Sequence, residues 1–299
     1  MDDVSARTVV VGLDRSEEAE AALRWARCNT RADARIVALH AWELQTLLAT
    51  DGPERAAGVG FQHLAEADLD LMLDGVCDSR IVRAVRRGRP GEVLVDESGG
   101  AALVVVGHRG DSRMQMMLGS TANYLVHRAG CPVVIVRGDG ELPARRVVVG
   151  IDAYRHGVDG AANESVNALR WAYRLPHVEQ IHLLNAWFVP AVEVGMFTRG
   201  IDVSTLDADA NRAIDLVVNA AGPAPSGIEV TRQVAHAASG EALVDASAGA
   251  DLVVVGSRGR GALRGLLLGS TSAEVAARAH SSVAVVRPRT RGPETLGDR

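Results

Sequence analysis

The sequence predicts an α/β protein of two tandem three-layer domains, each with a five-stranded parallel sheet. Three observations support this prediction. The 299-residue chain is long enough for about two domains, the same series of motifs occurs twice in it, and each copy alternates apolar strands with amphipathic helices. Its composition, 47% hydrophobic and 23% charged, is ordinary for a globular protein. We expect domains at 1–140 and 144–290, followed by a polar tail at 291–299.

The repeat consists of matched motifs that follow one another in the same order. Val9–Trp25 begins VVVGLD and ends ALRW, and Val147–Trp171 begins VVVGID and ends in the same letters. Further pairs are ALHAW with LLNAW, GEVL with GEAL, LVVVGHRG with LVVVGSRG, LGST with LGST, and VVIVR with VAVVR. A period of about 140 residues indicates a duplicated domain and not a solenoid. The joint falls near Gly138–Arg145, where two glycines and a proline predict a short linker.

Four of the five predicted strands of the first unit are short apolar runs, as expected for strands buried on both faces of a parallel sheet. Ile81–Arg86 has mixed polarity, which predicts an edge strand. The predicted strands are Val9–Gly12, Ile36–His40, Ile81–Arg86, Leu103–Gly107 and Val133–Arg137. The predicted helices are Glu17–Arg27, Phe61–Val76, Glu92–Ser98 and Ser120–Arg128. This alternation favours right-handed crossovers between parallel strands.

Charge and composition exclude several classes of function. The net charge of −5 gives no basic excess for nucleic acid, the 3% aromatic residues leave few stacking platforms, and no segment is apolar enough for a membrane span. All 32 basic residues are arginine, so a Walker-type loop lysine is excluded. No GxGxxG follows the first strand, which argues against a dinucleotide-binding dehydrogenase.

The cysteines and the start of the chain point to a reducing compartment. Cys28, Cys77 and Cys131 are odd in number and widely spaced, so we expect small buried residues and neither disulfides nor a zinc site. The opening MDDVSART lacks the features of a signal peptide. We therefore expect a cytoplasmic protein.

The strongest candidate site is a glycine-containing loop in the second unit. Gly256-Ser-Arg-Gly259 is followed by nine residues and then by Gly269-Ser270-Thr271, which open a predicted helix. Glycines let a backbone approach a phosphate closely, and the free N–H groups of a helix N-terminus attract anions. Ser270 and Thr271 can either cap the helix or bind phosphate oxygens. The pattern therefore predicts a lysine-free phosphate cradle.

With this motif, G-x2-G-x9-G-[S/T], and with the opening VVVGxD, the chain resembles the universal stress protein family over nearly its whole length, as two tandem copies. The resemblance implies the strand order 3-2-1-4-5 and an adenine-nucleotide-binding type of domain, with ATP held between the first and fourth strands. Mg²⁺ can accompany the ATP. It also implies a role in stress response or growth control.

Carried over by position, the resemblance places the adenine amino group on Asp152 and the phosphates on the cradle. The residues it implies in the second unit are Gly150, Asp152, Ala186, Val255, Gly256, Arg258, Gly259, Gly269, Ser270 and Thr271. Those in the first unit are Gly12, Asp14, Ala41, Val106, Gly107, Arg109, Gly110, Gly119, Ser120 and Thr121.

Two departures distinguish the units. Only eight residues, Asp111–Leu118, separate Gly110 from Gly119, one fewer than the motif requires. In the second unit an insertion within Ala153–Asn163 follows Asp152, and it can cover or obstruct the base.

The last strands, Pro132–Arg137 and Ser282–Pro288, are apolar and would lie at sheet edges, where exposed backbone invites pairing. We expect the two units to pair through them as an internal dimer, and we expect further homodimerisation and a protein partner of unknown identity. Three functions remain open: an ATP-binding regulatory protein, a slow ATPase, and an interaction scaffold without nucleotide. The sequence shows no nucleophile positioned beside a base, so this feature of an enzyme is missing from it.

Overall fold

The computed structural model describes residues 7–43, 54–109, 118–152, 161–188, 203–257 and 268–287. The first half alternates strands and helices as predicted. Its elements are β1 (Thr8–Leu13), α1 (Glu17–Asn29), β2 (Arg35–Trp42), α2 (Glu54–Met72), β3 (Ile81–Arg87), α3 (Pro90–Ser98), β4 (Leu103–Gly107), α4 (Ser120–Arg128) and β5 (Val133–Val136). Compared with the prediction, α2 begins seven residues earlier and ends four earlier.

The second half repeats this series. Its elements are β6 (Arg146–Ile151), α5 (Ala161–Ala172), β7 (Gln180–Ala186), α7 (Val203–Ala221), β8 (Glu229–Ala235), α8 (Ser239–Ser247), β9 (Leu252–Gly256), α9 (Ser270–Arg278) and β10 (Ser282–Val286). Each element has its counterpart in the first half at the place that the sequence repeat indicates.

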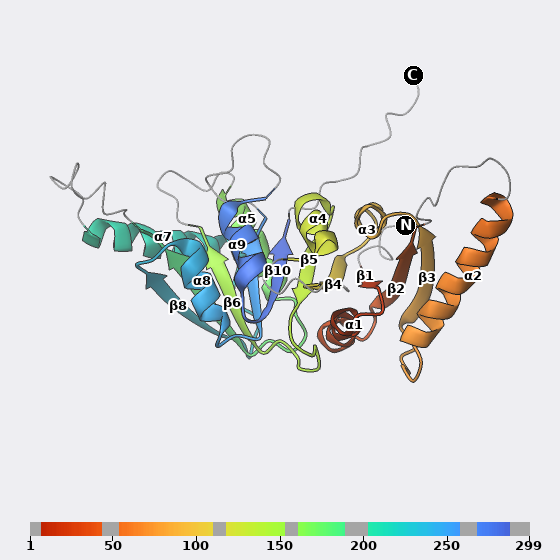
Figure 1. Ribbon diagram of the computed structural model, residues 1–299. Helices are drawn as coiled ribbons and strands as arrows, with labels where there is room; N and C mark the ends of the chain where they lie inside the picture. The colour runs from red at the N-terminus through yellow and green to blue at the C-terminus, as the bar shows by residue number, and fades with distance from the viewer. Residues whose placement is uncertain are drawn as a thin grey trace, which may run out of the picture.

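The strands form one continuous sheet of ten strands in the order β3-β2-β1-β4-β5-β10-β9-β6-β7-β8 (Figure 1). Within each half the strands are parallel and follow the order 3-2-1-4-5, with β3 at an outer edge as its polarity predicted. The halves meet where β5 pairs antiparallel with β10, with Ile135 opposite Val283. The strands of the two halves therefore run in opposite directions. The carboxyl ends of the first half's strands lie on the same side of the sheet as the amino ends of the second half's strands.

Helices cover both faces of the sheet. The face of the sheet that carries Val9 and Val11 is covered by α1, α2, α5 and α7, and the face that carries Val10 is covered by α3, α4, α8 and α9. Both cores consist mainly of Val, Leu, Ala and Ile, in keeping with a sequence in which only 3% of the residues are aromatic. Each core contains residues from both halves, so the junction is part of the hydrophobic interior.

Two matched arginines link the halves beside the β5–β10 pair. The Arg137 guanidinium donates to the main-chain oxygen of Ala276 in α9, at 2.5 Å. The Arg287 guanidinium donates in the same way to the main-chain oxygen of Val126 in α4. In each case a cation meets the carbonyl-rich end of the other half's last helix, where the helix dipole favours positive charge.

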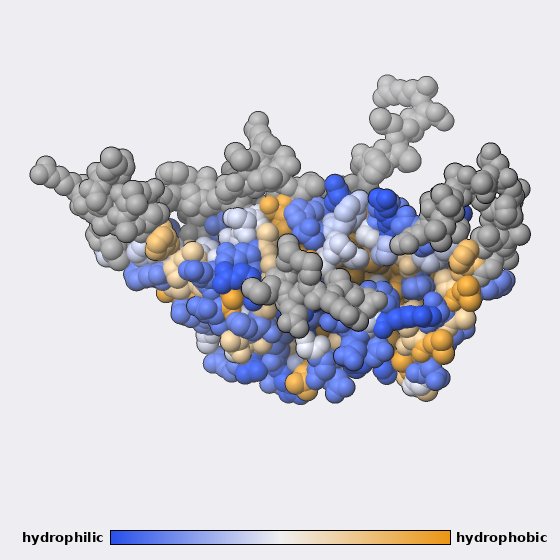
Figure 2. Space-filling model, in the orientation of Figure 1, coloured by the Kyte–Doolittle hydropathy of each residue, from blue (hydrophilic) through white to orange (hydrophobic). Residues whose placement is uncertain are grey.

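The described surface differs from the sequence expectation at one cysteine. Cys131 is buried and Cys28 is half-buried, but Cys77 is exposed, so the prediction of buried cysteines is wrong for Cys77. Figure 2 shows apolar surface over α2, where Phe61, Leu64 and Leu71 are exposed. None of the described helices is long and apolar enough to cross a membrane.

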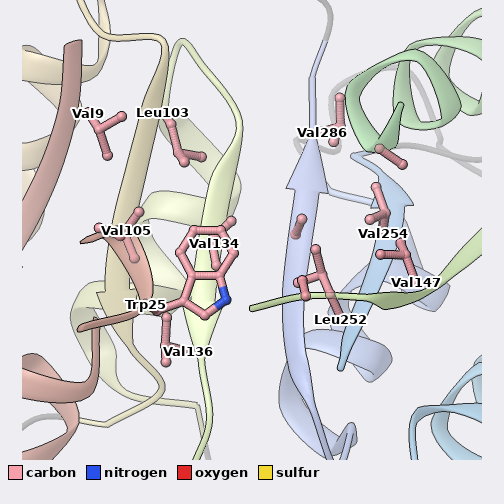
Figure 3. Packing of buried hydrophobic residues seen from close by; sticks show 14 of the residues in the cluster. Val9, Trp25, Leu103, Val105, Val134, Val136, Val147, Leu252, Val254 and Val286 are labelled. Carbon is pink, nitrogen blue, oxygen red and sulfur yellow. The ribbon is translucent and has the colours of Figure 1, made fainter. Parts of the chain in front are cut away.

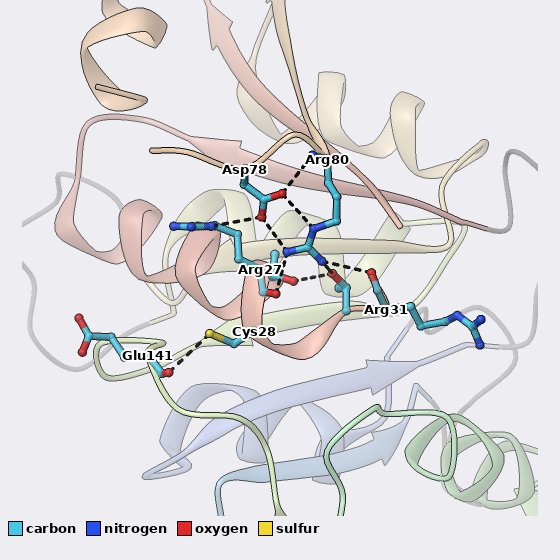
Figure 4. Close-up of polar contacts among 8 residues, drawn as sticks. Arg27, Cys28, Arg31, Asp78, Arg80 and Glu141 are labelled. Carbon is cyan, nitrogen blue, oxygen red and sulfur yellow. Dashed lines mark hydrogen bonds and ion pairs between the residues drawn. The ribbon is translucent and has the colours of Figure 1, made fainter. Parts of the chain in front are cut away.

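A polar network holds the turn before β3 against the end of α1 (Figure 4). Asp78 accepts hydrogen bonds from Nε and Nη2 of Arg80, at 3.0 and 2.7 Å, and from Nε of Arg27 at 3.3 Å. The same Arg80 guanidinium donates to the main-chain oxygens of Arg27 and Arg31, at 2.9 and 3.1 Å. The bond to Arg27 supplies a partner for a carbonyl group in the last turn of α1, where the helix leaves carbonyls without an intrahelical donor.

We expect this network to make the protein sensitive to acid. Hydrogen bonds from Arg80 lower the pKa of Asp78 from 3.8 to about 2. Because the folded-state pKa is the lower one, the stabilisation is complete above about pH 4 and is lost as the pH falls toward 2. Asp78→Asn should remove about 2 kcal/mol of unfolding free energy at neutral pH, measured in urea, and should flatten its dependence on pH below 4. Asp70→Asn, which breaks the exposed pair with Arg83, is the control and should cost less than about 0.5 kcal/mol.

Candidate functional site

The carboxyl ends of β1 and β4 meet at one edge of the first half. The two strands are parallel neighbours, with Val9 opposite Leu103, so the loops that follow them lie together although they are far apart in the sequence. A pocket of about 190 Å³ lies at this edge. Its walls come from the ends of β1, β2 and β4 and from the first turns of α1, α3 and α4.

The pocket brings together the residues that the sequence indicated in the first half. Those lining it are Gly12, Asp14, Ala41, Val106, Gly107, Arg109, Gly119, Ser120 and Thr121. The remaining one, Gly110, lies outside the described residues. Sequence reasoning missed Leu13, Ala19, Leu39, Pro90, Leu94 and Ala122, which also line it. The repeated motifs GEVL and GEAL could have indicated Leu94, because a leucine at the same place in both units indicates that it has the same structural role in both.

Two glycines shape the pocket by close approach. A Cβ on Gly12 would lie 2.9 Å from Leu94 Cδ1, so this glycine lets α3 pack against the end of β1. A Cβ on Gly107 would lie 2.7 Å from the main-chain oxygen of Glu18. The end of β4 and the first turn of α1 therefore touch through backbone, which leaves no room for a side chain.

The loop after β1 is held in place at both ends. His40 Nδ1 lies 2.9 Å from the main-chain oxygen of Leu13, the residue before Asp14. On the other side, both N–H and O–H of Ser16 donate to Asp14 Oδ1, and Ser16 Oγ accepts from the Ala19 N–H at the start of α1. Asp14 is exposed. Its carboxylate is therefore positioned by the loop and remains accessible to a ligand.

The two glycine-containing segments after β4 are joined by a hydrogen bond. The Gly119 N–H donates to the main-chain oxygen of His108 at 2.8 Å, which brings the start of α4 beside the end of β4. Gly119 is the N-cap of α4, and no side chain bonds the first turn. The same holds for Gly269 and α9. Capping by Ser270 or Thr271, one of the two roles considered for them, is therefore wrong, and their hydroxyls are not used in a cap.

Positive charge collects beside this cradle. Burial, and then the charges of Arg137 and Arg109, lower the pKa of His108. Burial and the nearby Arg109 also lower the pKa of Arg137, to about 10, which still leaves it charged at neutral pH. The cradle therefore has Arg109 in its lining and a helix N-terminus, with the Arg137 guanidinium nearby, an arrangement that favours anions.

The second half places its counterparts in the same relation. β6 and β9 are parallel neighbours, so Gly150 and Asp152 at the end of β6 face Val255 and Gly256 at the end of β9. The Gly269 N–H donates to the Ser257 main-chain oxygen at 2.8 Å, matching the bond in the first half. The difference of one residue in the spacer therefore leaves the two ends of both cradles joined alike. Ala186, Ser270 and Thr271 lie at the matching ends of β7 and α9.

Buried hydrogen bonds distinguish the second site. Ser257 Oγ donates to Glu164 Oε2 at 2.9 Å, and Ser272 Oγ donates to the main-chain oxygen of Gly256 at 2.6 Å. Asn185 Nδ2 donates to the main-chain oxygen of Ile151, as the counterpart of His40. Arg258, Gly259 and the insertion after Asp152 lie outside the described residues, so the prediction that the insertion covers or obstructs this site stays a prediction.

Comparison with known proteins decides the family. The model of the universal stress protein family matches residues 5–137 and again residues 143–287. The chain belongs to the universal stress protein family. The two matches correspond to the two halves of the sheet, so the family's domain occurs here in tandem.

Relatives with the same tandem length are known. A universal stress protein of Mycolicibacterium smegmatis is 31% identical over 94% of this chain and 97% of its own. One from Mycobacterium tuberculosis is 30% identical over 93% of this chain and 96% of its own. The crystal structure of a universal stress protein from Archaeoglobus fulgidus has a TM-score of 0.63 at 20% identity and covers 94% of this chain and 98% of its own, which shows the shared fold.

Metal-binding side chains do not cluster in the ranges that the structure describes. No group of three or more His, Cys, Asp or Glu residues there is arranged to hold a metal ion.

Proposed function

We propose that the protein is an ATP-binding regulatory protein and that the pocket of the first half holds the nucleotide. The observation that carries this proposal is that the Asp14 carboxylate and the N-terminus of α4 border one pocket. The carboxylate can accept a hydrogen bond from the adenine amino group, and the N-terminus can donate to phosphates. ATP carries an amino-substituted ring at one end and a triphosphate at the other, so one molecule can engage both groups.

The size of the pocket determines how ATP would lie. Its volume of about 190 Å³ is below the roughly 300–1,000 Å³ of most ligand sites, so it accommodates the base and part of the ribose. The apolar side chains of Leu39, Leu94 and Val106 suit an adenine ring. The triphosphate, with Mg²⁺, would extend from the pocket along the first turn of α4, toward Arg109.

ATP would regulate the protein by changing the balance between its conformations. A ligand shifts an equilibrium between conformations by as much as its affinity for them differs. The cradle of the first half is connected to the second half through Arg137, which lowers the pKa of His108 on one side and bonds α9 on the other. ATP phosphates near Arg109 and Arg137 would therefore change the charge balance at the junction. We propose that partners distinguish the two states in stress response or growth control, and that the second half has an equivalent site.

The test is to identify nucleotide released from the purified protein and to measure ATP affinity by calorimetry. We expect adenine nucleotide in the wild type. Ser120→Glu places a carboxylate where the phosphates would bind and should weaken binding at this site at least about tenfold through like-charge repulsion. An acidic residue in the first turn of a helix is favourable, so folding should be maintained.

Ser270→Glu is the matched variant of the second half and reports on that site alone. Unfolding curves of both variants check that neither loses stability. Absence of adenine nucleotide and of ATP binding in the wild type would contradict the proposal. Unchanged affinity and stoichiometry in Ser120→Glu would contradict the placement of ATP in the first half. Sustained ATP turnover would favour the ATPase.

A further inference from the structure

A second, larger cavity lies between the two halves on the side of α1 and α5. It has a volume of about 590 Å³ and is formed by the first residues of β1, β4 and β5, the end of α1, the second half of α5 and the end of β10. We call it the junction groove. Its apolar wall includes Val9, Leu103, Trp171 and Val286. Of the described residues that are expected to bind nucleotide, none lines it.

The matching groove on α1 is filled by the linker between the halves. Arg24 Nε donates to the main-chain oxygen of Asp139 at 2.8 Å, and Asn29 Oδ1 accepts from the Ala144 N–H at 2.7 Å. Gly140 packs so closely on α1 that a Cβ there would lie 2.1 Å from the main-chain oxygen of Ala21. Figure 4 shows Glu141 of the linker beside Cys28.

The sequence repeat relates the two grooves residue by residue. The residues of α1 that contact the linker are Ala21, Arg24, Trp25, Cys28 and Asn29. Their counterparts in the second half are Asn167, Arg170, Trp171, Arg174 and Leu175, and all five line the junction groove. Trp25 is 3% exposed, whereas Trp171 is only half-buried. The junction groove is thus lined by the counterparts of the residues that hold an extended segment of chain, the linker, on α1.

Its charge indicates what kind of segment would fit. The lining contains five arginines and one carboxylate, Asp33. Arg7 and Arg31 share that carboxylate, at 3.4 and 3.0 Å, so the groove keeps a positive excess. The linker that fills the matching groove carries Asp139 and Glu141 together with Leu142 and Pro143.

We propose that the junction groove binds an extended acidic peptide segment of a partner protein, with an apolar residue on the apolar wall and carboxylates on the arginines. The chain's own tail, 288–299, is a poor match because its three arginines outnumber its two acidic side chains. Arginine pairs with carboxylates through two parallel hydrogen bonds, which would strengthen the binding of an acidic segment and fix its position along the groove.

The experiment uses the full chain and a synthetic peptide with the linker's sequence, GDGELPA, followed by the NMR signal of the Trp171 indole. That signal is identified by its loss in Trp171→Phe. We expect saturable binding at peptide concentrations below about 1 mM. Arg174→Glu should weaken it at least about tenfold, and so should the neutral peptide GNGQLPA. Arg83→Glu, on the distant edge strand β3, is the charge-matched control and should leave the affinity unchanged.

Several results would overturn the proposal. Absence of binding up to about 1 mM would do so, as would equal binding of GNGQLPA. Displacement of the GDGELPA peptide by inorganic phosphate or ATP at matched ionic strength would indicate a site for small anions. Displacement by a peptide of residues 288–299 at equal or lower concentration would indicate that the chain's own tail is the occupant.

Discussion

Gly140→Ala is expected to lower the free energy of unfolding by about 3 kcal/mol or more, because two separate costs coincide at this position. Gly140 has a φ of +70°, which a residue with a Cβ adopts only with strain. Its new Cβ would also lie 2.1 Å from the main-chain oxygen of Ala21, in the middle of α1. Neither backbone can move without separating the linker from the helix.

Gly138→Ala is the matched control. Gly138 has nearly the same φ, +74°, but open space where the Cβ would point. It should cost only the backbone strain, about 1–2 kcal/mol. The difference between the two variants in urea unfolding therefore measures the close packing of the linker on α1. Equal losses would show that this packing contributes nothing to stability.

Trp25→Ala is expected to cost about 3–5 kcal/mol, the usual range for removing a large buried aromatic side chain. Trp25 is 3% exposed and lies beside Val134 and Val136 of β5, close to the junction of the halves (Figure 3). Its removal would leave a cavity between α1, the central strands and the linker.

The matched variant, Trp171→Ala, should cost clearly less, about half as much, because Trp171 already borders the open junction groove. Both free energies come from the same urea titrations, with Trp25→Phe as a milder substitution that should recover part of the loss. A cost for Trp171→Ala as large as that for Trp25→Ala would contradict an open groove in solution.

The sequence predicted the fold well because the repeated motifs and the apolar strands can each be recognised from a short stretch of residues. The strands were correct within two residues at either end, and the pairing of the two last strands followed from their apolar edges. The start of α2 at Glu54 was missed, since Ala56, Ala57 and Gly58 give no apolar stripe. The linker was recognised from its glycines and proline, but its packing on α1 depends on a positive φ at Gly140 and on tertiary contacts that no local pattern encodes.

The candidate site was only partly accessible to such reasoning. Glycine and hydroxyl residues at strand and helix ends could be identified by motif, whereas no motif marked Pro90, which reaches the pocket from the first turn of α3 and required the fold. The hydroxyls of the cradle were also considered as helix caps. Capping failed because Gly119 and Gly269 already occupy the N-cap positions, which leaves the Ser and Thr side chains beyond the reach of the cap geometry.

The antiparallel β5–β10 pair joins two copies of one domain that the linker also tethers covalently, and this changes what a single substitution can do. In an assembly of identical subunits, every replacement appears twice and must be tolerated at both places. Here each replacement appears once, so one copy can diverge while the other keeps the original chemistry. The filled and open grooves, and the two cradles with unequal spacers, show this freedom in use.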